Sequence, residues 1–321
     1  MQSFELLSQK FALYFDKRHF PDEPSSLYDP NEYFLKLGGK RVRPVLCLMG
    51  NEIFEDIKED AWHVGTAIEL FHNFTLIHDD IMDKAPLRRG METVHTKYGE
   101  STALLAGDVM LVTAYEELNK ISIEYLQSIL HLFNRTAKEV CEGQQMDMDF
   151  EKLETVSMSS YLKMIELKTS VALAASLQTG AILGGAGERN QNLLYGFGKK
   201  LGIAFQVQDD YLDAFGDPQK FGKQVGGDIL ANKKTFLLLH AFEIATAAQQ
   251  KELRSLLAGN AVDKIEKTLQ VFHDCKVDEW ALQFKDKYLD EAFVHLEDIA
   301  VLSKRKEPLK ELAHFLIKRD H

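Results

Sequence analysis

The amino-acid sequence predicts an all-α protein, and three observations lead to that prediction. Apolar residues recur at helical spacing in one segment after another, and the alternation typical of strands does not recur. Residues that disrupt helices are sparse, with 20 glycines and 7 prolines among 321 residues. Because no linker-like segment separates the helical patterns, we expect one domain that covers residues 1–321.

The expected elements follow in chain order. Residues 3–18 carry an apolar stripe and predict a first helix, and residues 21–30, rich in proline, serine and aspartate, predict a loop. Pro44 suits the first turn of a helix through residues 45–51. The further helical patterns cover residues 60–83, 101–119, 123–149, 157–184, 190–213, 235–257, 261–272, 278–302 and 306–318. Residues 214–235 predict a long irregular connection, and such connections are often functional lids.

Three aspartates, Asp79, Asp80 and Asp83, lie at the end of the helix predicted over residues 60–83. Asp79 and Asp83 are four residues apart and share one helix face, where two unpaired carboxylates repel each other. A cation between them removes the repulsion. Oxygen ligands suit Mg²⁺, which binds through one or two carboxylates together with substrate phosphates. Taken alone, the cluster fits a solvated helix end equally well.

A second cluster has the same spacing. Asp209, Asp210 and Asp213 also follow an apolar run with helical character, residues 201–207. Two such clusters, each at the end of an apolar helix, are difficult to explain as solvated surface. If the two helices face each other, the clusters form one acidic site that binds metal.

Basic residues accompany both clusters: Lys40, Arg43, Arg88, Arg89, Lys168, Lys223 and Lys233. The paired arginines after the first cluster match phosphate geometry. Lys40 and Arg43 follow two glycines at a helix start, which indicates an anion site or a basic surface turn. Lys168 lies in an apolar helix, where it either extends to solvent or reaches an anion.

Residues upstream of the first cluster share its helix face. His72 precedes Asp79 by seven residues, about two helical turns, which favours a functional position over a core histidine. Phe71 and Phe74 would line the floor of a cavity beneath the metal site, and plain core packing is the alternative for each.

Composition excludes several classes of protein. The formal net charge of −11 and the lack of a basic stretch argue against a nucleic-acid partner. The three cysteines are widely separated, which indicates a reducing compartment. No apolar run approaches the ~20 residues that span a bilayer, and the N-terminus lacks a signal-peptide core. We therefore expect a soluble, cytoplasmic protein without stable membrane insertion.

The sequence therefore predicts a site for the diphosphate of an apolar substrate. Its parts are two acidic clusters with a metal, several separate basic residues and apolar surroundings. No Ser/His/Asp arrangement and no glycine-rich phosphate loop is legible in the sequence. The expected chemistry is therefore metal-assisted departure of diphosphate.

Seven segments in order resemble the trans-polyprenyl diphosphate synthases: GGKRVRP, HNFTLIHDDIMDKAPLRRG, GQQMD, LKTS, FQVQDDYLD, FGK and DILANKKT. This resemblance implies an isoprenoid synthase-like helical bundle around a central cavity, commonly a homodimer. It also implies condensation of isopentenyl diphosphate with C5–C15 allylic diphosphates by a new 1′–4 bond, with release of diphosphate.

The resemblance also implies roles for individual residues. Metal ligands are expected at Asp79, Asp83 and Asp209 for about three Mg²⁺ ions, with Asp213 as a further ligand and Asp80 and Asp210 in support. Residues expected to hold the allylic diphosphate are Arg88, Lys168, Lys223 and Lys233. Those expected to hold isopentenyl diphosphate are Lys40, Arg43, His72 and Arg89. Thr169 and Gln206 would stabilise the allylic carbocation with oriented oxygens.

Product length depends, in this family, on the residues before the first cluster. Thr75 and Phe74 lie four and five positions before Asp79, and Phe71 lies one turn deeper. An aromatic residue at the fifth position, a small one at the fourth and no insertion in the motif resemble short-chain geranylgeranyl synthases. The prediction is a C20 product, with C15 as the alternative.

Three other functions fit less well. A terpene cyclase shares the first aspartate motif but carries a different second motif. A di-iron oxidase requires paired Glu-x-x-His motifs on facing helices, and the three matches in this chain fit chance. A non-catalytic partner subunit usually lacks one aspartate motif, whereas both are intact here.

Overall fold

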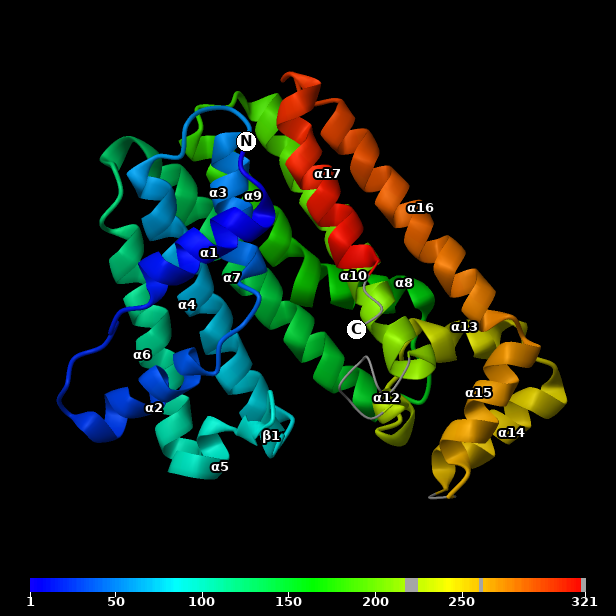
Figure 1. Cartoon of the computed structure of the whole chain (residues 1–321). Helices are drawn as coiled ribbons and strands as arrows, with labels where there is room; N and C mark the ends of the chain where they lie inside the picture. Colours follow the sequence, from blue (N-terminus) through cyan, green and yellow to red (C-terminus); the bar gives the residue numbers. More distant parts are fainter. Residues whose placement is uncertain (217–224, 260–261, 319–321) are drawn as a thin grey trace. The chain divides into compact units, whose positions relative to one another are not determined.

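The structure is a computed structural model that describes residues 1–216, 225–259 and 262–318, and helices form almost all of it (Figure 1). The prediction of an all-α protein is confirmed. The chain divides into two compact units. Unit 1 comprises residues 1–133 and 176–191, and unit 2 comprises residues 134–175 and the chain from residue 192 onward. Among the described helices, none is long and apolar enough to cross a membrane.

The elements that begin in unit 1 are α1 (Phe4–Phe15), α2 (Ser25–Lys36), α3 (Val42–Glu52), α4 (Glu59–Met82), β1 (Leu87–Arg88), β2 (Met91–Glu92), α5 (Val94–Tyr98), α6 (Glu100–Leu118) and α7 (Ile123–Lys152). The elements that follow are α8 (Met158–Ile165), the π-helix η1 (Glu166–Ser170), α9 (Val171–Leu183), α10 (Glu188–Phe215), α12 (Gly227–Leu230), α13 (Phe236–Ile244), α14 (Ala247–Ala258), α15 (Lys264–Asp274), α16 (Val277–Glu297) and α17 (Ser303–Ile317).

Unit 1 is built on close packing between helix backbones. The helix α4 packs along α6 and α3. Where α9 meets α3, a Cβ on Gly180 would overlap the carbonyl oxygen of Cys47, and a Cβ on Gly50 would overlap that of Leu177. Glycine is therefore required at both positions, and this contact fixes the place of α3 within the unit.

Unit 2 has a core of buried apolar side chains from α8, α10 and α13 to α16. Phe236 is fully buried and packs against Trp280 and Phe284, with ring centroids 5.6 and 6.1 Å away. The helices α16 and α17 run side by side in Figure 1.

One predicted element near the N-terminus was wrong, and one short element after the first aspartate cluster was not predicted. The predicted loop over residues 21–30 is helical from Ser25, because α2 buries Phe34 and Leu35 on one face and this burial outweighs the loop-forming residues. The hairpin of β1 and β2 was not predicted, since strands of two residues give no periodic signal. Its turn places Arg89 and Gly90 at φ values of 54° and 78°, as a two-residue type I′ turn requires.

Two predicted continuous helices are interrupted. The helix predicted over residues 157–184 contains the π-helical turn Glu166–Ser170. The helix predicted over residues 235–257 breaks before Thr246, whose side chain accepts from the Gln249 amide while the Gln249 side chain accepts from the Thr246 amide. This capping box begins α14 and, with the extended residue Ala245, separates it from α13.

Candidate active site

The first aspartate cluster lies at the C-terminal end of α4 and divides into two kinds of residue. Asp80 is buried and accepts from Arg88, with Nε 2.8 Å from Oδ2 and Nη2 2.8 Å from Oδ1. Asp79 is half-buried, and Asp83 is the exposed C-cap residue. The middle aspartate therefore binds the β1–β2 hairpin, and the outer two remain one helical turn apart.

Basic residues of unit 1 gather around His72, and we call Arg43, His72, Arg88 and Arg89 the arginine cluster. Arg43 donates from Nη1 to Nε2 of His72 at 3.1 Å. Burial, followed by the charges of Arg43, Arg89 and Arg88, lowers the pKa of His72 well below its usual value. A neutral imidazole is thus the acceptor that Arg43 needs.

One hydrogen-bond donor of Arg43 lacks an acceptor in the described part of the chain. Its Nε is buried and has no hydrogen-bond partner among the residues that the structure describes. A buried donor without a partner costs free energy, about 1–3 kcal/mol. An anion that accepts from Nε would remove that cost. Lys40, three residues earlier, is exposed at the start of the same segment.

The residues predicted to set product length lie along α4 as expected from their spacing. Phe71 is 7% exposed and packs edge-on against Phe133 at 5.2 Å, while Phe74 is half-buried and packs on Phe71 at 5.8 Å. The Thr75 hydroxyl donates to the carbonyl oxygen of His72 at 2.8 Å. This internal bond leaves a methyl group as the remaining end of the Thr75 side chain.

The second cluster, in unit 2, divides in the same way as the first. Asp210 is buried, accepts from the Tyr161 hydroxyl and from Gln206 Nε2 at 2.9 Å, and has its pKa raised to about 7, mainly by burial. Asp213 accepts from the backbone amide of Asp228 at 3.0 Å. Asp209 is half-buried on the same helix.

Segments on either side of α10 contribute the remaining predicted residues of unit 2. Lys168 donates to Asp147 at 2.6 Å, and the Thr169 hydroxyl lies 3.4 Å from Oε1 of Gln206. Both Lys168 and Thr169 belong to the π-helical turn, a distortion that is frequent at functional sites. Lys233 lies 3.4 Å from Asp228.

The structure thus brings Arg43, His72, Arg88 and Arg89 together in unit 1, and Thr169, Gln206 and the second aspartate cluster together in unit 2. Lys223 lies outside the described residues. That the two aspartate clusters face each other stays a prediction. Sequence reasoning missed Tyr161 and Asp147 as partners; Asp147 belongs to the quoted GQQMD motif, whereas Tyr161 carried no local signal.

The donor set agrees in kind with Mg²⁺, because every predicted ligand is a carboxylate oxygen. No group of three or more His, Cys, Asp or Glu side chains within the described ranges is arranged to hold a metal by itself. Coordination would therefore require water and ligand oxygens in addition, which is usual for Mg²⁺.

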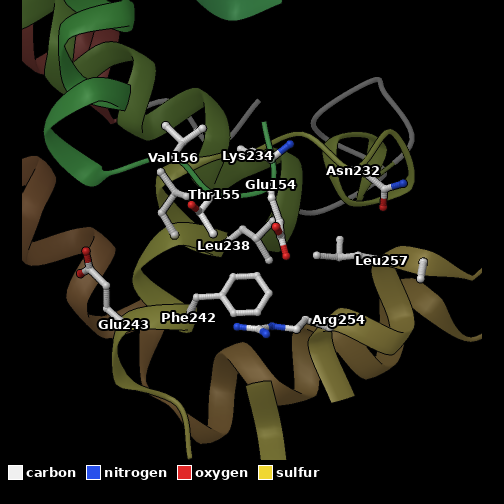
Figure 2. A pocket seen from close by; sticks show the side chains of 12 residues that line it. Glu154, Thr155, Val156, Asn232, Lys234, Leu238, Phe242, Glu243, Arg254 and Leu257 are labelled. Carbon is white, nitrogen blue, oxygen red and sulfur yellow. The ribbon is translucent and has the colours of Figure 1, made fainter. Parts of the chain in front are cut away.

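A hollow of about 570 Å³ in unit 2 is lined mainly by residues of α13, α14 and the connection between α7 and α8 (Figure 2). Leu238, Phe242 and Leu257 form its apolar side, and the Arg254 guanidinium lies 5.9 Å from the Phe242 ring. Lys234 borders it as well and donates to the carbonyl oxygen of Phe150 at 2.8 Å. Of the predicted functional residues that the structure describes, none lines this hollow.

Comparison with known proteins places the chain among enzymes of one kind. The sequence pattern of the family described as polyprenyl synthetase matches residues 24–274. A geranylgeranyl pyrophosphate synthase of Geoglobus acetivorans is 40% identical over 303 residues, which cover 93% of this chain and 92% of that protein.

Solved structures agree with the sequence comparison. A crystal structure of a geranylgeranyl pyrophosphate synthase has a TM-score of 0.95 and 42% identity, and the match covers 99% of both chains. A polyprenyl synthase from Caulobacter crescentus, complexed with calcium and isoprenyl diphosphate, has a TM-score of 0.87 and 25% identity, with 99% of this chain and 96% of that chain covered. The isoprenoid synthase-like fold expected from the sequence is thereby confirmed.

Proposed function

The chain belongs to the polyprenyl synthetase family and is a prenyltransferase, and from this premise we propose that it condenses isopentenyl diphosphate with allylic diphosphates by a 1′–4 bond. The bond forms between C4 of isopentenyl diphosphate and C1 of the allylic substrate. Diphosphate leaves from C1, and a proton is lost from the isopentenyl unit. The preferred product is C20 geranylgeranyl diphosphate, with C15 as the alternative.

One observation supports this proposal most directly: both aspartate clusters use the middle carboxylate inside the protein. Asp80 binds Arg88, and Asp210 binds Tyr161 and Gln206. The outer carboxylates of each cluster lie one turn apart at the end of their helix, as expected if they bind metal. That both helix ends point toward one substrate is part of the proposal.

Asp79, Asp83, Asp209 and Asp213 would hold Mg²⁺, which when bound neutralises diphosphate charge and favours its departure. Arg88, Lys168, Lys223 and Lys233 would bind the allylic diphosphate. The hydroxyl of Thr169 and the amide oxygen of Gln206 lie 3.4 Å apart, so both can present oxygen dipoles to a developing allylic cation.

Arg43, His72 and Arg89 of the arginine cluster, with Lys40, would bind isopentenyl diphosphate. Neutral His72 can accept from Arg43 and donate from its other ring nitrogen to a phosphate oxygen. The buried Nε of Arg43 would gain its missing acceptor. Isopentenyl diphosphate bound here supplies the nucleophilic double bond, and a homodimer in the cytoplasm is the setting that we propose.

Metal removal tests the reaction class. The protein is treated with EDTA and assayed with isopentenyl diphosphate and farnesyl diphosphate, before and after Mg²⁺ is restored. The proposal expects no elongation in EDTA and full recovery with Mg²⁺. Elongation that continues at the same rate without divalent metal would contradict it.

A further inference from the structure

Arg41, between the two predicted ligands Lys40 and Arg43, points its side chain into unit 1 and not to solvent. Its side chain is 10% exposed and pairs with Glu69, whose side chain is 5% exposed. Nη2 donates to the carbonyl oxygen of Leu35 at 3.2 Å, and the guanidinium lies over the Phe15 ring at 4.7 Å. One side chain thus joins the start of α3 to α1, α2 and α4.

The Glu69 carboxylate has a second partner. Asn73 Nδ2 donates to Glu69 Oε1 at 2.8 Å and to the carbonyl oxygen of Glu69 at 2.7 Å. Glu69 and Asn73 lie on α4 on either side of His72 in sequence, so they share the part of the helix that carries the arginine cluster. We call Arg41, Glu69 and Asn73 the Glu69 network.

Residues 38–43, the segment that the Glu69 network holds, are half-buried or exposed. Gly38, Gly39 and Arg41 border a hollow of about 750 Å³ on the side of α1 and α2. Arg41 itself has a φ of 50°, which is unfavourable for a residue with a Cβ and has to be compensated by its contacts. The Arg41 side chain therefore helps to hold residues 38–41, which precede α3, in place.

The same segment meets the arginine cluster on its other side. A Cβ on Gly39 would lie 3.0 Å from Nη2 of Arg89, so backbone and guanidinium are nearly in contact. Arg43 follows Arg41 by two residues and contacts His72. A shift of residues 38–43 would therefore move Lys40 and Arg43 and free Arg89 from its neighbour.

A buried ion pair is weak evidence for stability, because apolar replacements of similar volume are often as stable. Its geometry, in contrast, is specific: the guanidinium fork has two acceptors in fixed directions, Glu69 Oε1 and the Leu35 carbonyl oxygen. Burial lowers the pKa of Arg43 and of Arg89, and the Glu69 carboxylate opposes that shift at both residues, as Asp80 does at Arg89. A role in positioning nearby cations therefore explains the Arg41–Glu69 pair better than a contribution to stability does.

We propose that Arg41, Glu69 and Asn73 are positioning residues that hold residues 38–43 against the arginine cluster and so set the affinity for isopentenyl diphosphate. The inference rests on the proposed function, since it concerns the binding half of that reaction. It assigns no contact with substrate to the three residues. The allylic diphosphate, held by other segments, is not affected.

The experiment compares Arg41→Met, Glu69→Met and the double variant Arg41→Met/Glu69→Met. Each single variant leaves one buried charge unpaired and lowers Tm, whereas the double variant regains most of the lost Tm because no charge is unpaired. In the double variant, KM for isopentenyl diphosphate rises about tenfold or more, since displaced binding groups have effects of this order. KM for farnesyl diphosphate and kcat at saturation stay within about twofold, a margin well below the displaced-group effect.

Two controls make the result specific. Lys306→Met removes another cation whose side chain is 5% exposed, on α17, and leaves KM for isopentenyl diphosphate unchanged. Glu69→Gln keeps one side-chain oxygen, which can accept from Arg41 and Asn73 as Oε1 does, but removes the charge, and it gives a smaller rise in KM than the double variant. An unchanged KM for isopentenyl diphosphate in a well-folded double variant would overturn the inference, as would an equal rise in both KM values. Absence of elongation in the unmodified protein would instead refute the proposed function.

Discussion

Asp80 and Arg88 form a bidentate ion pair in which the carboxylate is 2% exposed and both guanidinium donors lie within 2.8 Å of an oxygen. Arg88 belongs to the hairpin that follows α4. The pair thus fixes the hairpin to the helix end, and Asp79 and Asp83 are the carboxylates of this cluster that we propose as metal ligands.

This relationship predicts different losses for neighbouring aspartates. Asp79→Ala should lower kcat by at least about 10²–10³-fold with little change in Tm, because the proposed role of this half-buried carboxylate is charge stabilisation. Asp80→Ala should lower Tm as well, since it leaves the half-buried Arg88 guanidinium without its carboxylate partner. Steady-state rates and thermal unfolding of both variants provide the check. A near-normal rate for Asp79→Ala would show the ligand assignment to be wrong.

A second prediction concerns the contact of α3 with α9. Gly180→Ala should reduce the free energy of unfolding by about 1–3 kcal/mol or more, because its Cβ overlaps the Cys47 carbonyl oxygen. The matched control is Gly187→Ala, where a Cβ meets nothing within 4 Å and the change should stay within about 0.5 kcal/mol. Urea denaturation measures both, and equal effects would contradict the packing.

The histidine of the arginine cluster predicts a pH dependence. Its pKa in the folded protein lies well below the value of about 6.5 in the unfolded chain. Between these values the unfolded chain binds more protons, so the contribution of His72 to stability is present above about pH 6.5 and is lost as the pH falls through the folded pKa.

Urea denaturation between pH 8 and pH 5 tests this sign in the free protein. As the pH falls, the free energy of unfolding of the unmodified protein should decrease relative to that of His72→Gln. A difference that is constant with pH would mean that the pKa of His72 is the same in the folded and the unfolded chain, and would contradict the lowered pKa.

Product length should follow the residues along α4. Phe74→Ala should extend the main product beyond C20, and Thr75→Phe should shorten it to C15, because each changes the room next to the growing chain. Phe71, which packs on Phe133, should matter only once Phe74 is small. Mass spectrometry measures the chain length of the products. An unchanged product from Phe74→Ala would exclude Phe74 as the floor of the product cavity.

The sequence was sufficient for most of the helices because their apolar spacing is long and regular. The helix predicted over residues 60–83 is α4, Glu59–Met82, and that predicted over residues 190–213 is α10, Glu188–Phe215. Interruptions of a helix within a long apolar pattern were not predicted, because local hydrogen bonds determine where they occur. Thr246 and the π-helical turn are the two examples.

The partners of the site residues were beyond reach of the sequence. Tyr161 lies 49 positions from Asp210, and Arg41 lies 28 positions from Glu69. Such pairs arise from tertiary packing, and neither spacing nor composition carries a signal for them. The residue types at the aspartate motifs, in contrast, were legible because their chemistry is local.

The most direct test of the proposed function is a product assay. Purified protein receives Mg²⁺, isopentenyl diphosphate and in turn the C5, C10 and C15 allylic diphosphates, and mass spectrometry determines the chain length. We expect elongation from each primer with C20 as the dominant product. No elongation from any primer would contradict the assignment as a chain-elongating synthase.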